Sequence, residues 1–318
     1  MRVQTILVPV DFSEGSKRAL HWAADLAKRH DAQLHLLHVM AAYGPEWYGE
    51  AEPLPQVDAL RNELETDARE GLEAMAPNPD RSGVASNVTV VHDLNVAGAI
   101  LEETADAHAD LIVMGTHGRS GIEHALLGSV AEKVVRRAPQ MVLTVGKEAA
   151  GSPSVERVLA PTDFSKPSKQ ALRTAKQLAA TYDAQLDVLF VAEERVVPIF
   201  RDTGLPGVSL LKMDPEIVNN AVDAIDHLSD EVGGPEVAVQ GHVAKGKVAP
   251  RIIDFTESHG VDLIVMATRG LTGLNHFLIG SVAERVVRRA PCPVLTMHAA
   301  EEEEGAREGD AAAPAESE

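Results

Sequence analysis

Residues Asp110–Val145 read DLIVMGTHGRSGIEHALLGSVAEKVVRRAPQMVLTV, and this stretch decides the fold of the chain. Asp110–Met114 is an apolar, β-branched run of the length expected for a buried parallel strand. A glycine-rich polar loop follows, and from Ser129 apolar residues recur at helical spacing until Pro139. Val142–Val145 then has the composition of a short strand. The stretch therefore predicts a strand, a loop, a helix and a second strand.

The same stretch occurs a second time in the chain. Asp262–Met297 repeats it at 24 of 36 positions, 152 residues later, and the same offset links Asp11 to Asp163. A constant offset across both halves indicates a duplicated domain. We therefore predict one domain at residues 1–146, a linker at 147–154, a second domain at 155–298 and a tail at 299–318.

Apolar segments with strand and helix periodicity alternate along each half. In the first half, strands are predicted at Thr5–Pro9, Gln33–Val39, Val88–His92, Asp110–Met114 and Val142–Val145, and helices at Ser16–His30, Gln56–Met75, Val96–His108 and from Ser129. In the second half, strands are predicted at Val155–Pro161, Gln185–Val191, Glu236–Val243 and Val261–Met266, helices at Lys169–Ala180, Val218–Val232 and Val248–His259, and a loop at 193–213. This alternation predicts an α/β fold in each half, with a doubly wound parallel sheet and helices on both faces.

The charge of the chain excludes some classes of partner. The net charge of −19 argues against binding to nucleic acid or to an anionic membrane surface. Residues Glu301–Glu318 contribute eight acidic residues and one arginine, a composition that predicts a disordered, solubilising tail. The 10 lysines and 19 arginines of this acidic chain suggest, as a hypothesis, a halophilic protein from a high-salt cytoplasm.

The chain has the features of a cytoplasmic protein. No apolar run approaches the ~20 residues that span a bilayer, and the strand at Thr5–Pro9 leaves no room for a signal peptide. The single cysteine, Cys292, is predicted to be a small buried residue. His35 and His38 point to opposite faces of one strand, so no metal site is predicted from protein side chains alone. The loop with Trp47 and Tyr48 is left open between a lid, a partner contact and a plain surface loop.

The glycine-rich loop has the spacing Gly115, two residues, Gly118, nine residues, Gly128, Ser129. Glycines allow the backbone to approach a bulky anion, because they lack a Cβ atom and adopt positive φ freely. The helix that begins at Ser129 would offer N–H groups and a dipole that favour phosphate. The alternative is an ordinary connection in which Ser129 and Glu132, repeated as Ser281 and Glu284, form a capping box.

A carboxylate joins this loop in the predicted fold. Asp11 stands at the carboxyl end of the first strand, where ligands bind in doubly wound sheets. It can accept hydrogen bonds from a ribose or a base, and its alternative role is to cap the following helix. Carboxylate, glycine loop and helix N-terminus together suggest a nucleotide.

These motifs resemble the universal stress protein family. The resemblance rests on Pro9-Val10-Asp11, His38-Val39 and Met114-Gly115-x2-Gly118-x9-Gly128-Ser129-Val130, and the glycine spacing is that of the ATP-binding branch. It implies a flavodoxin-like (Rossmann-like) sheet of five strands in each half, with the order 3-2-1-4-5, and a last strand that pairs across a dimer. In this tandem chain it implies an intramolecular pseudo-dimer through Val142–Val145 and Val294–Met297, with a homodimer as a further option.

The resemblance also implies a binding site in each half. The first would use Pro9, Val10, Asp11, Val39, Met114, Gly115, Gly118, Arg119, Gly128, Ser129 and Val130, and the second Pro161, Thr162, Asp163, Val191, Met266, Ala267, Gly270, Gly280, Ser281 and Val282. The second site departs from the motif, because Ala267 replaces the first glycine and Leu271 replaces Arg119. A methyl group there would crowd a ligand or resist a positive φ, so the second site is expected to be weaker.

The function implied by the resemblance is a regulatory stress-response module that binds ATP accompanied by Mg²⁺. AMP or a cyclic adenine nucleotide is an alternative ligand, and protein partners are unknown. A second reading is slow ATP hydrolysis or phosphotransfer, although the chain lacks a Walker lysine and a two-carboxylate metal site. A third is a protein-interaction scaffold with a vestigial nucleotide loop.

Overall fold

The structure, a computed structural model, describes residues 2–40, 55–118, 127–149, 153–193, 196–197, 208–209, 216–268 and 279–298. The first half contains β1 (Thr5–Pro9), α1 (Glu14–His30), β2 (Gln33–Met40), α2 (Pro55–Met75), α3 (Pro79–Ser82), β3 (Ser86–His92), α4 (Val96–Asp106), β4 (Leu111–Gly115), α5 (Ser129–Arg137) and β5 (Met141–Val145). The second half contains β6 (Arg157–Thr162), α6 (Lys166–Tyr182), β7 (Gln185–Ala192), β8 (Val196–Val197), β9 (Val208–Ser209), α8 (Glu216–Val232), β10 (Val239–Lys245), α9 (Val248–His259), β11 (Leu263–Ala267), α10 (Ser281–Arg289) and β12 (Val294–Met297).

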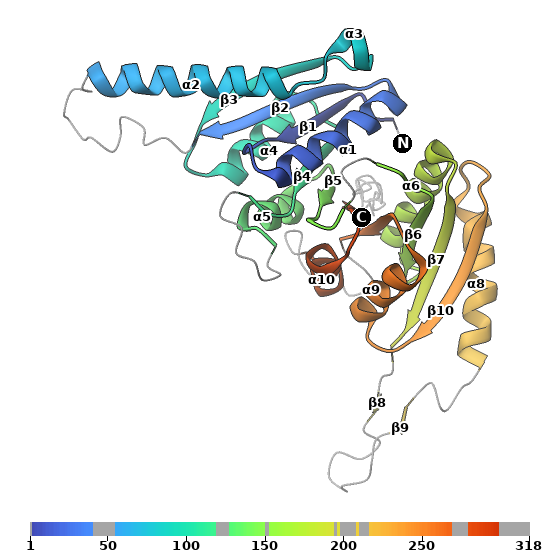
Figure 1. The fold of residues 1–318 in the computed structure, drawn as a ribbon. Helices are drawn as coiled ribbons and strands as arrows, with labels where there is room; N and C mark the ends of the chain where they lie inside the picture. The colour runs from blue at the N-terminus through green and yellow to red at the C-terminus, as the bar shows by residue number, and fades with distance from the viewer. Residues whose placement is uncertain are drawn as a thin grey trace, which may run out of the picture.

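The two halves share one continuous sheet of ten strands (Figure 1). Its order is β10-β7-β6-β11-β12-β5-β4-β1-β2-β3, so each half has the order 3-2-1-4-5. All neighbours within a half are parallel, whereas β5 and β12 pair antiparallel in the middle. The predicted fold is confirmed, and the two last strands pair within one molecule as the resemblance implied.

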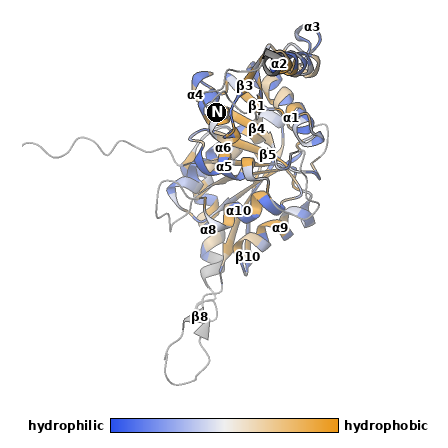
Figure 2. Cartoon of the chain, turned by 90° about the vertical axis from the view of Figure 1, so that its left-hand side faces the viewer, coloured by the Kyte–Doolittle hydropathy of each residue, from blue (hydrophilic) through white to orange (hydrophobic). Residues whose placement is uncertain are grey.

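The sheet separates two hydrophobic cores, one on each face. In β1, Ile6 and Val8 point into one core and Leu7 into the other, as the two-residue period of a strand requires. The first core includes residues of α1, α2, α6 and α8, and the second includes residues of α4, α5, α9 and α10. Figure 2 shows the apolar strands lying between helices that carry hydrophilic residues on the outside. Each core therefore runs across both halves.

The junction at the centre of the sheet is tightly bonded. Leu143 of β5 lies opposite Leu295 of β12, and both side chains are buried. The hydroxyls of Thr144 and Thr296 each donate to a carbonyl oxygen of the opposite strand at 3.1 Å. Because both threonines are buried, these reciprocal bonds satisfy polar groups that would otherwise lack water.

Helices α1 and α6 meet over this junction. Trp22 and Leu26 of α1 face Leu178 and Tyr182 of α6 around a small apolar cavity. The hydroxyl of Tyr182 donates to Asp25 Oδ2 at 2.7 Å. The two halves are thus joined by side-chain packing as well as by the sheet.

The boundaries of the elements differ from the sequence prediction where side chains cap or hold the backbone. Helix α1 begins two residues early because the hydroxyl oxygen of Ser13 accepts from Ser16 N at 3.3 Å. Strand β6 begins two residues later than predicted, at Arg157, the counterpart of Thr5 in β1. Asp262 accepts there from the N–H groups of Glu156 and Arg157, each at 2.9 Å, as Asp110 does at the start of β1.

Three short elements were missed by the sequence analysis. The one-turn helix α3 follows Asn78, whose side chain accepts from Asp80 N at 3.0 Å. Strands β8 and β9 pair antiparallel inside the segment predicted as a loop. The Trp47–Tyr48 loop and the acidic tail lie outside the described residues. In the part of the chain that is described, no helix is long and apolar enough to cross a membrane.

Candidate functional site

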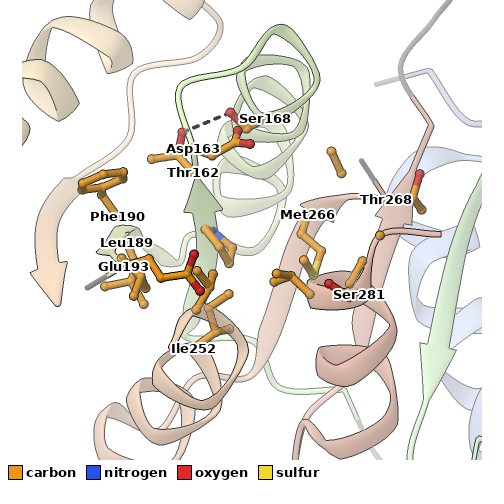
Figure 3. A pocket seen from close by; sticks show the side chains of 17 residues that line it. Thr162, Asp163, Ser168, Leu189, Phe190, Glu193, Ile252, Met266, Thr268 and Ser281 are labelled. Carbon is orange, nitrogen blue, oxygen red and sulfur yellow. Dashed lines mark hydrogen bonds between the residues drawn. The ribbon is translucent and has the colours of Figure 1, made fainter. Parts of the chain in front are cut away.

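Each half has a cavity at the carboxyl ends of its strands, where a doubly wound sheet places ligands. The first has a volume of about 530 Å³ and lies among β1, β2, β4, α4 and α5. The second, of about 390 Å³, lies among the matching elements β6, β7, β11, α9 and α10 (Figure 3). Both volumes fall in the range of small-molecule sites.

The predicted site residues line these cavities wherever the structure describes them. The first cavity is lined by Pro9, Val10, Asp11, Val39, Met114, Gly115, Gly118, Gly128, Ser129 and Val130. Pro161, Thr162, Asp163, Val191, Met266, Ala267, Gly280, Ser281 and Val282 line the second. Arg119 and Gly270 lie outside the described residues. Residues as far apart in the sequence as Pro9 and Val130, or Pro161 and Val282, therefore meet at one place in each half.

Asp11 is held in a tight turn between β1 and α1. Its Oδ1 atom accepts from the backbone N of Ser13 at 3.0 Å and from the Ser13 hydroxyl at 2.6 Å. The turn requires Phe12 to adopt a left-handed conformation, φ 64°, which costs about 1 kcal/mol or more for a residue with a side chain. Ser13 itself caps the helix. Asp11 is therefore not the N-cap residue of α1, as the alternative reading had it. It holds the N-cap residue, Ser13, in place.

The second half repeats this turn. Asp163 Oδ1 accepts from the backbone N of Ser165 at 3.1 Å and from its hydroxyl at 2.5 Å. Phe164 has φ 63°, and Ser165 caps α6. Because the same strained turn is built twice, the position of the carboxylate is a reproducible feature of the fold.

The glycines of the loop serve close backbone packing, and the expectation of positive φ was wrong. Gly115, Gly118 and Gly128 have negative φ. A Cβ atom on Gly115 would lie 2.8 Å from the carbonyl carbon of Gly15 in α1, and one on Gly118 would lie 2.6 Å from Asp11 Oδ2. The missing side chains let β4 approach α1 and let the loop approach the carboxylate.

Ala267 is compatible with the second cavity. Its φ is negative, so the expected resistance of alanine to this backbone conformation does not arise. The cavity that it lines remains open. The counterpart of Gly15 in the second half is Pro167, so the helix that faces this position differs between the halves.

The capping boxes considered as the alternative reading are not formed. Gly128 is the N-cap residue of α5, Ser129 is the first helical residue, and no side chain caps the helix. Glu132 turns away to pair with Arg136 at 2.5 Å. Helix α10 repeats this arrangement with Gly280 as its N-cap and with Glu284 paired to Arg288 at 2.7 Å.

The register of the cap explains this difference. The backbone N of Gly128 donates to Thr116 O at 2.8 Å, and that of Gly280 donates to Thr268 O at 2.8 Å. These bonds fix the glycines against the strand ends, so the glycines are the N-cap residues and the helices begin at Ser129 and Ser281. The first N–H groups of α5 and α10 consequently face the cavities without a side-chain cap.

Several residues of the cavity walls were missed by the motif. Five residues of the first cavity have an equivalent residue in the second cavity: Ser16/Ser168, Leu37/Leu189, Val96/Val248, Ile100/Ile252 and Thr116/Thr268. They were detectable, because each pair is identical at the offset of 152 residues. Glu193 lines the second cavity only and has no such signal, whereas His38 belongs to the motif and lines the first cavity. His38 Nδ1 donates to Val10 O at 2.6 Å, which fixes its ring beside the first cavity.

No metal site is formed by side chains within the described ranges, where no group of three His, Cys, Asp or Glu residues could hold an ion.

The fold and its two cavities define a duplicated flavodoxin-like α/β protein with one candidate site in each half. The model of the universal stress protein family matches residues 2–146 and 154–298. The chain belongs to the universal stress protein family.

Individual relatives agree with this assignment. A universal stress protein of Mycolicibacterium smegmatis is 28% identical over 303 residues, which cover 92% of this chain and 96% of the relative. One from Methanocaldococcus jannaschii is 34% identical over 146 residues, covering 45% of this chain and 81% of the relative. The crystal structure of a universal stress protein from Archaeoglobus fulgidus has a TM-score of 0.65 and 23% identity, covering 94% of this chain and 99% of that one. The tandem arrangement of the fold therefore also occurs in a solved structure.

Proposed function

We propose that the chain binds adenine nucleotides in both cavities, with ATP and its Mg²⁺ as the leading ligand, and acts as a regulatory stress-response module. AMP and a cyclic adenine nucleotide are the alternative ligands. The function is proposed for a cytoplasmic protein with unknown protein partners, organised as two domains at residues 1–146 and 155–298.

One observation carries this function: the same three-part cavity is built twice. Each cavity combines a carboxylate held in a strained turn, a helix N-terminus without a side-chain cap, and an apolar wall. The N–H groups and dipole of α5 suit phosphates at Gly128–Ser129. Asp11 suits a ribose hydroxyl, and the wall formed by Leu37, Val39 and Ile100 suits the face of a base.

The second site would bind in the same orientation. Gly280 and Ser281 would receive the phosphates, Asp163 the ribose, and Leu189, Val191 and Ile252 the base. Arg119 and Gly270 are proposed as further contacts because of their places in the motif. Neither cavity has a lysine among its described lining residues, so binding is favoured over phosphotransfer.

The test is calorimetric titration of ATP with magnesium into protein freed of bound nucleotide, in high-potassium buffer. Val130 and Val282 occupy equivalent positions at the start of α5 and α10 and line the two cavities. We expect wild-type protein to bind at two sites, Val130→Trp to lose the first, and Val282→Trp to lose the second, because indole fills the respective cavity.

Each single variant is the control for the other, and thermal unfolding checks that both fold. If ATP, AMP and cyclic AMP give no heat at millimolar concentration, the scaffold reading replaces this function. Binding that survives in the double variant would place the nucleotide elsewhere. Steady ATP turnover that Asp11→Asn abolishes would favour the enzyme reading.

A further inference from the structure

Among the lining residues that the structure describes, the second cavity has one carboxylate, Glu193, with no counterpart in the first. Glu193 follows the last residue of β7 and lines the second cavity. In Figure 3 its side chain extends from the end of β7 toward the space above Ile252, with the carboxylate directed into the cavity. The residue 152 positions earlier is Ala41, so the sequence of the first half has no carboxylate at the matching position.

Glu193 lies at the end of the cavity that is away from the helix N-terminus. Figure 3 places Ser281, at the start of α10, on the other side of the cavity from Glu193. Figure 3 shows the apolar side chains of Leu189 and Ile252 beside Glu193, and both line the cavity. If phosphates bind at the start of α10, as the proposed function requires, the base would extend toward this apolar end, on the side where Glu193 lies.

We propose that Glu193 determines base specificity in the second cavity by accepting a hydrogen bond from an amino group on the base. This inference rests on the proposed function and makes it more specific. An ionised carboxylate is an acceptor only, so it matches an amino donor such as the 6-amino group of adenine. A base that has hydrogen in place of this amino group leaves the carboxylate without that partner.

The charge of Glu193 has an opposite effect that the experiment must separate. A carboxylate repels every triphosphate ligand to the same degree, whichever base the ligand has. Absolute ATP affinity is therefore a poor measure of the hydrogen bond. The ratio of affinities for ATP and for purine riboside triphosphate, which lacks only the 6-amino group, removes the common repulsion.

The experiment uses the full chain with Val130→Trp, which leaves only the second cavity for binding. Titration calorimetry gives the ATP preference over purine riboside triphosphate. We expect a preference of about fivefold, the size of an ordinary net hydrogen bond. It falls to about one with Glu193→Ala, and Glu193→Gln keeps part of it because the amide oxygen is still an acceptor.

The matched control places Glu193→Ala in the Val282→Trp protein, where only the first cavity binds and the ratio is expected to stay unchanged. An equal ratio in the parent and in Glu193→Ala would overturn the role of Glu193, while ATP binding itself would preserve the proposed function. If the Val130→Trp protein binds no nucleotide while the Val282→Trp protein still does, the second cavity is not a nucleotide site. Both its proposed binding and the role of Glu193 would then be overturned, and the first cavity would be unaffected.

Discussion

The substitution Gly115→Ala tests whether the glycine of the loop is a packing requirement. The added Cβ atom would lie 2.8 Å from the carbonyl carbon of Gly15 and 3.0 Å from its oxygen. Carbon atoms pack best at about 3.5–4.0 Å, so α1 and β4 must separate by roughly half an ångström or more. Both atoms belong to the backbone of a helix start, which cannot rotate away as a side chain would.

The expected cost follows from this overlap. Overpacking of a well-filled interior costs about 1–3 kcal/mol. Because the two halves share their cores, a loss of about 2 kcal/mol corresponds to a fall in Tm of roughly 3 °C for a unit of this size. The reverse substitution in the second half, Ala267→Gly, creates no overlap and should cost at most about 1 kcal/mol through backbone entropy. Thermal and urea unfolding of the two variants give the comparison directly.

Binding provides a second measurement on the same variants. Moving α1 from β4 also moves the turn that holds Asp11, so Gly115→Ala should weaken ATP binding at the first cavity and leave the second unchanged. If Gly115→Ala is as stable as wild type, the close approach of β4 to α1 is not the reason for glycine. The ligand-approach explanation from the sequence would then be restored.

Three further outcomes are expected. Asp11→Ala should lower the free energy of unfolding by about 2 kcal/mol, because two hydrogen bonds to the helix cap are lost, whereas Asp11→Asn should nearly retain stability; urea unfolding distinguishes them. Leu143→Ala and Leu295→Ala should each cost about 2–5 kcal/mol, and a double-mutant cycle should show coupling, since additive effects would deny their contact across the junction. Burial lowers the pKa of His35, so the neutral imidazole is favoured in the folded state. The contribution of neutral His35 to stability is complete above pH ~6.5 and is lost as pH falls through the folded pKa. His35→Gln should therefore reduce the loss of stability in acid, measured by urea unfolding curves over a pH series.

The sequence contained most of the fold because the fold depends on apolar periodicity. Strands such as Thr5–Pro9 have the predicted limits, since their ends coincide with the ends of the apolar run. The start of β6 was predicted two residues too early, although Arg157 is the counterpart of Thr5 at the offset of 152 residues. The starts of β1 and β6 are held by the equivalent aspartates Asp110 and Asp262, so the repeat itself would have placed this limit.

For the candidate site, the motif residues that the structure describes line the cavities, while the capping box considered as an alternative is absent. Helix α5 begins at Ser129 as predicted, and the bond from Gly128 N to Thr116 O makes Gly128 the N-cap residue in place of Ser129. That bond depends on how closely the loop returns to β4, which is a property of the folded chain. The duplication would have given the apolar walls as well, since Ile100 and Ile252 are identical at the offset that defines the repeat.

Comparing the lining residues of the two halves also indicates which positions of the cavities are free to differ. Ile100 and Ile252 are almost fully buried in the second core as well as lining the cavities. A change there would alter packing on one face of the ten-stranded sheet, so these positions are constrained by stability. Glu193 is exposed and borders the cavity from beyond the end of β7, and it can change without disturbing a core. A duplicated fold with a shared core can therefore keep similar apolar walls in its two cavities while residues beyond the strand ends, such as Glu193 and its counterpart Ala41, differ between the halves.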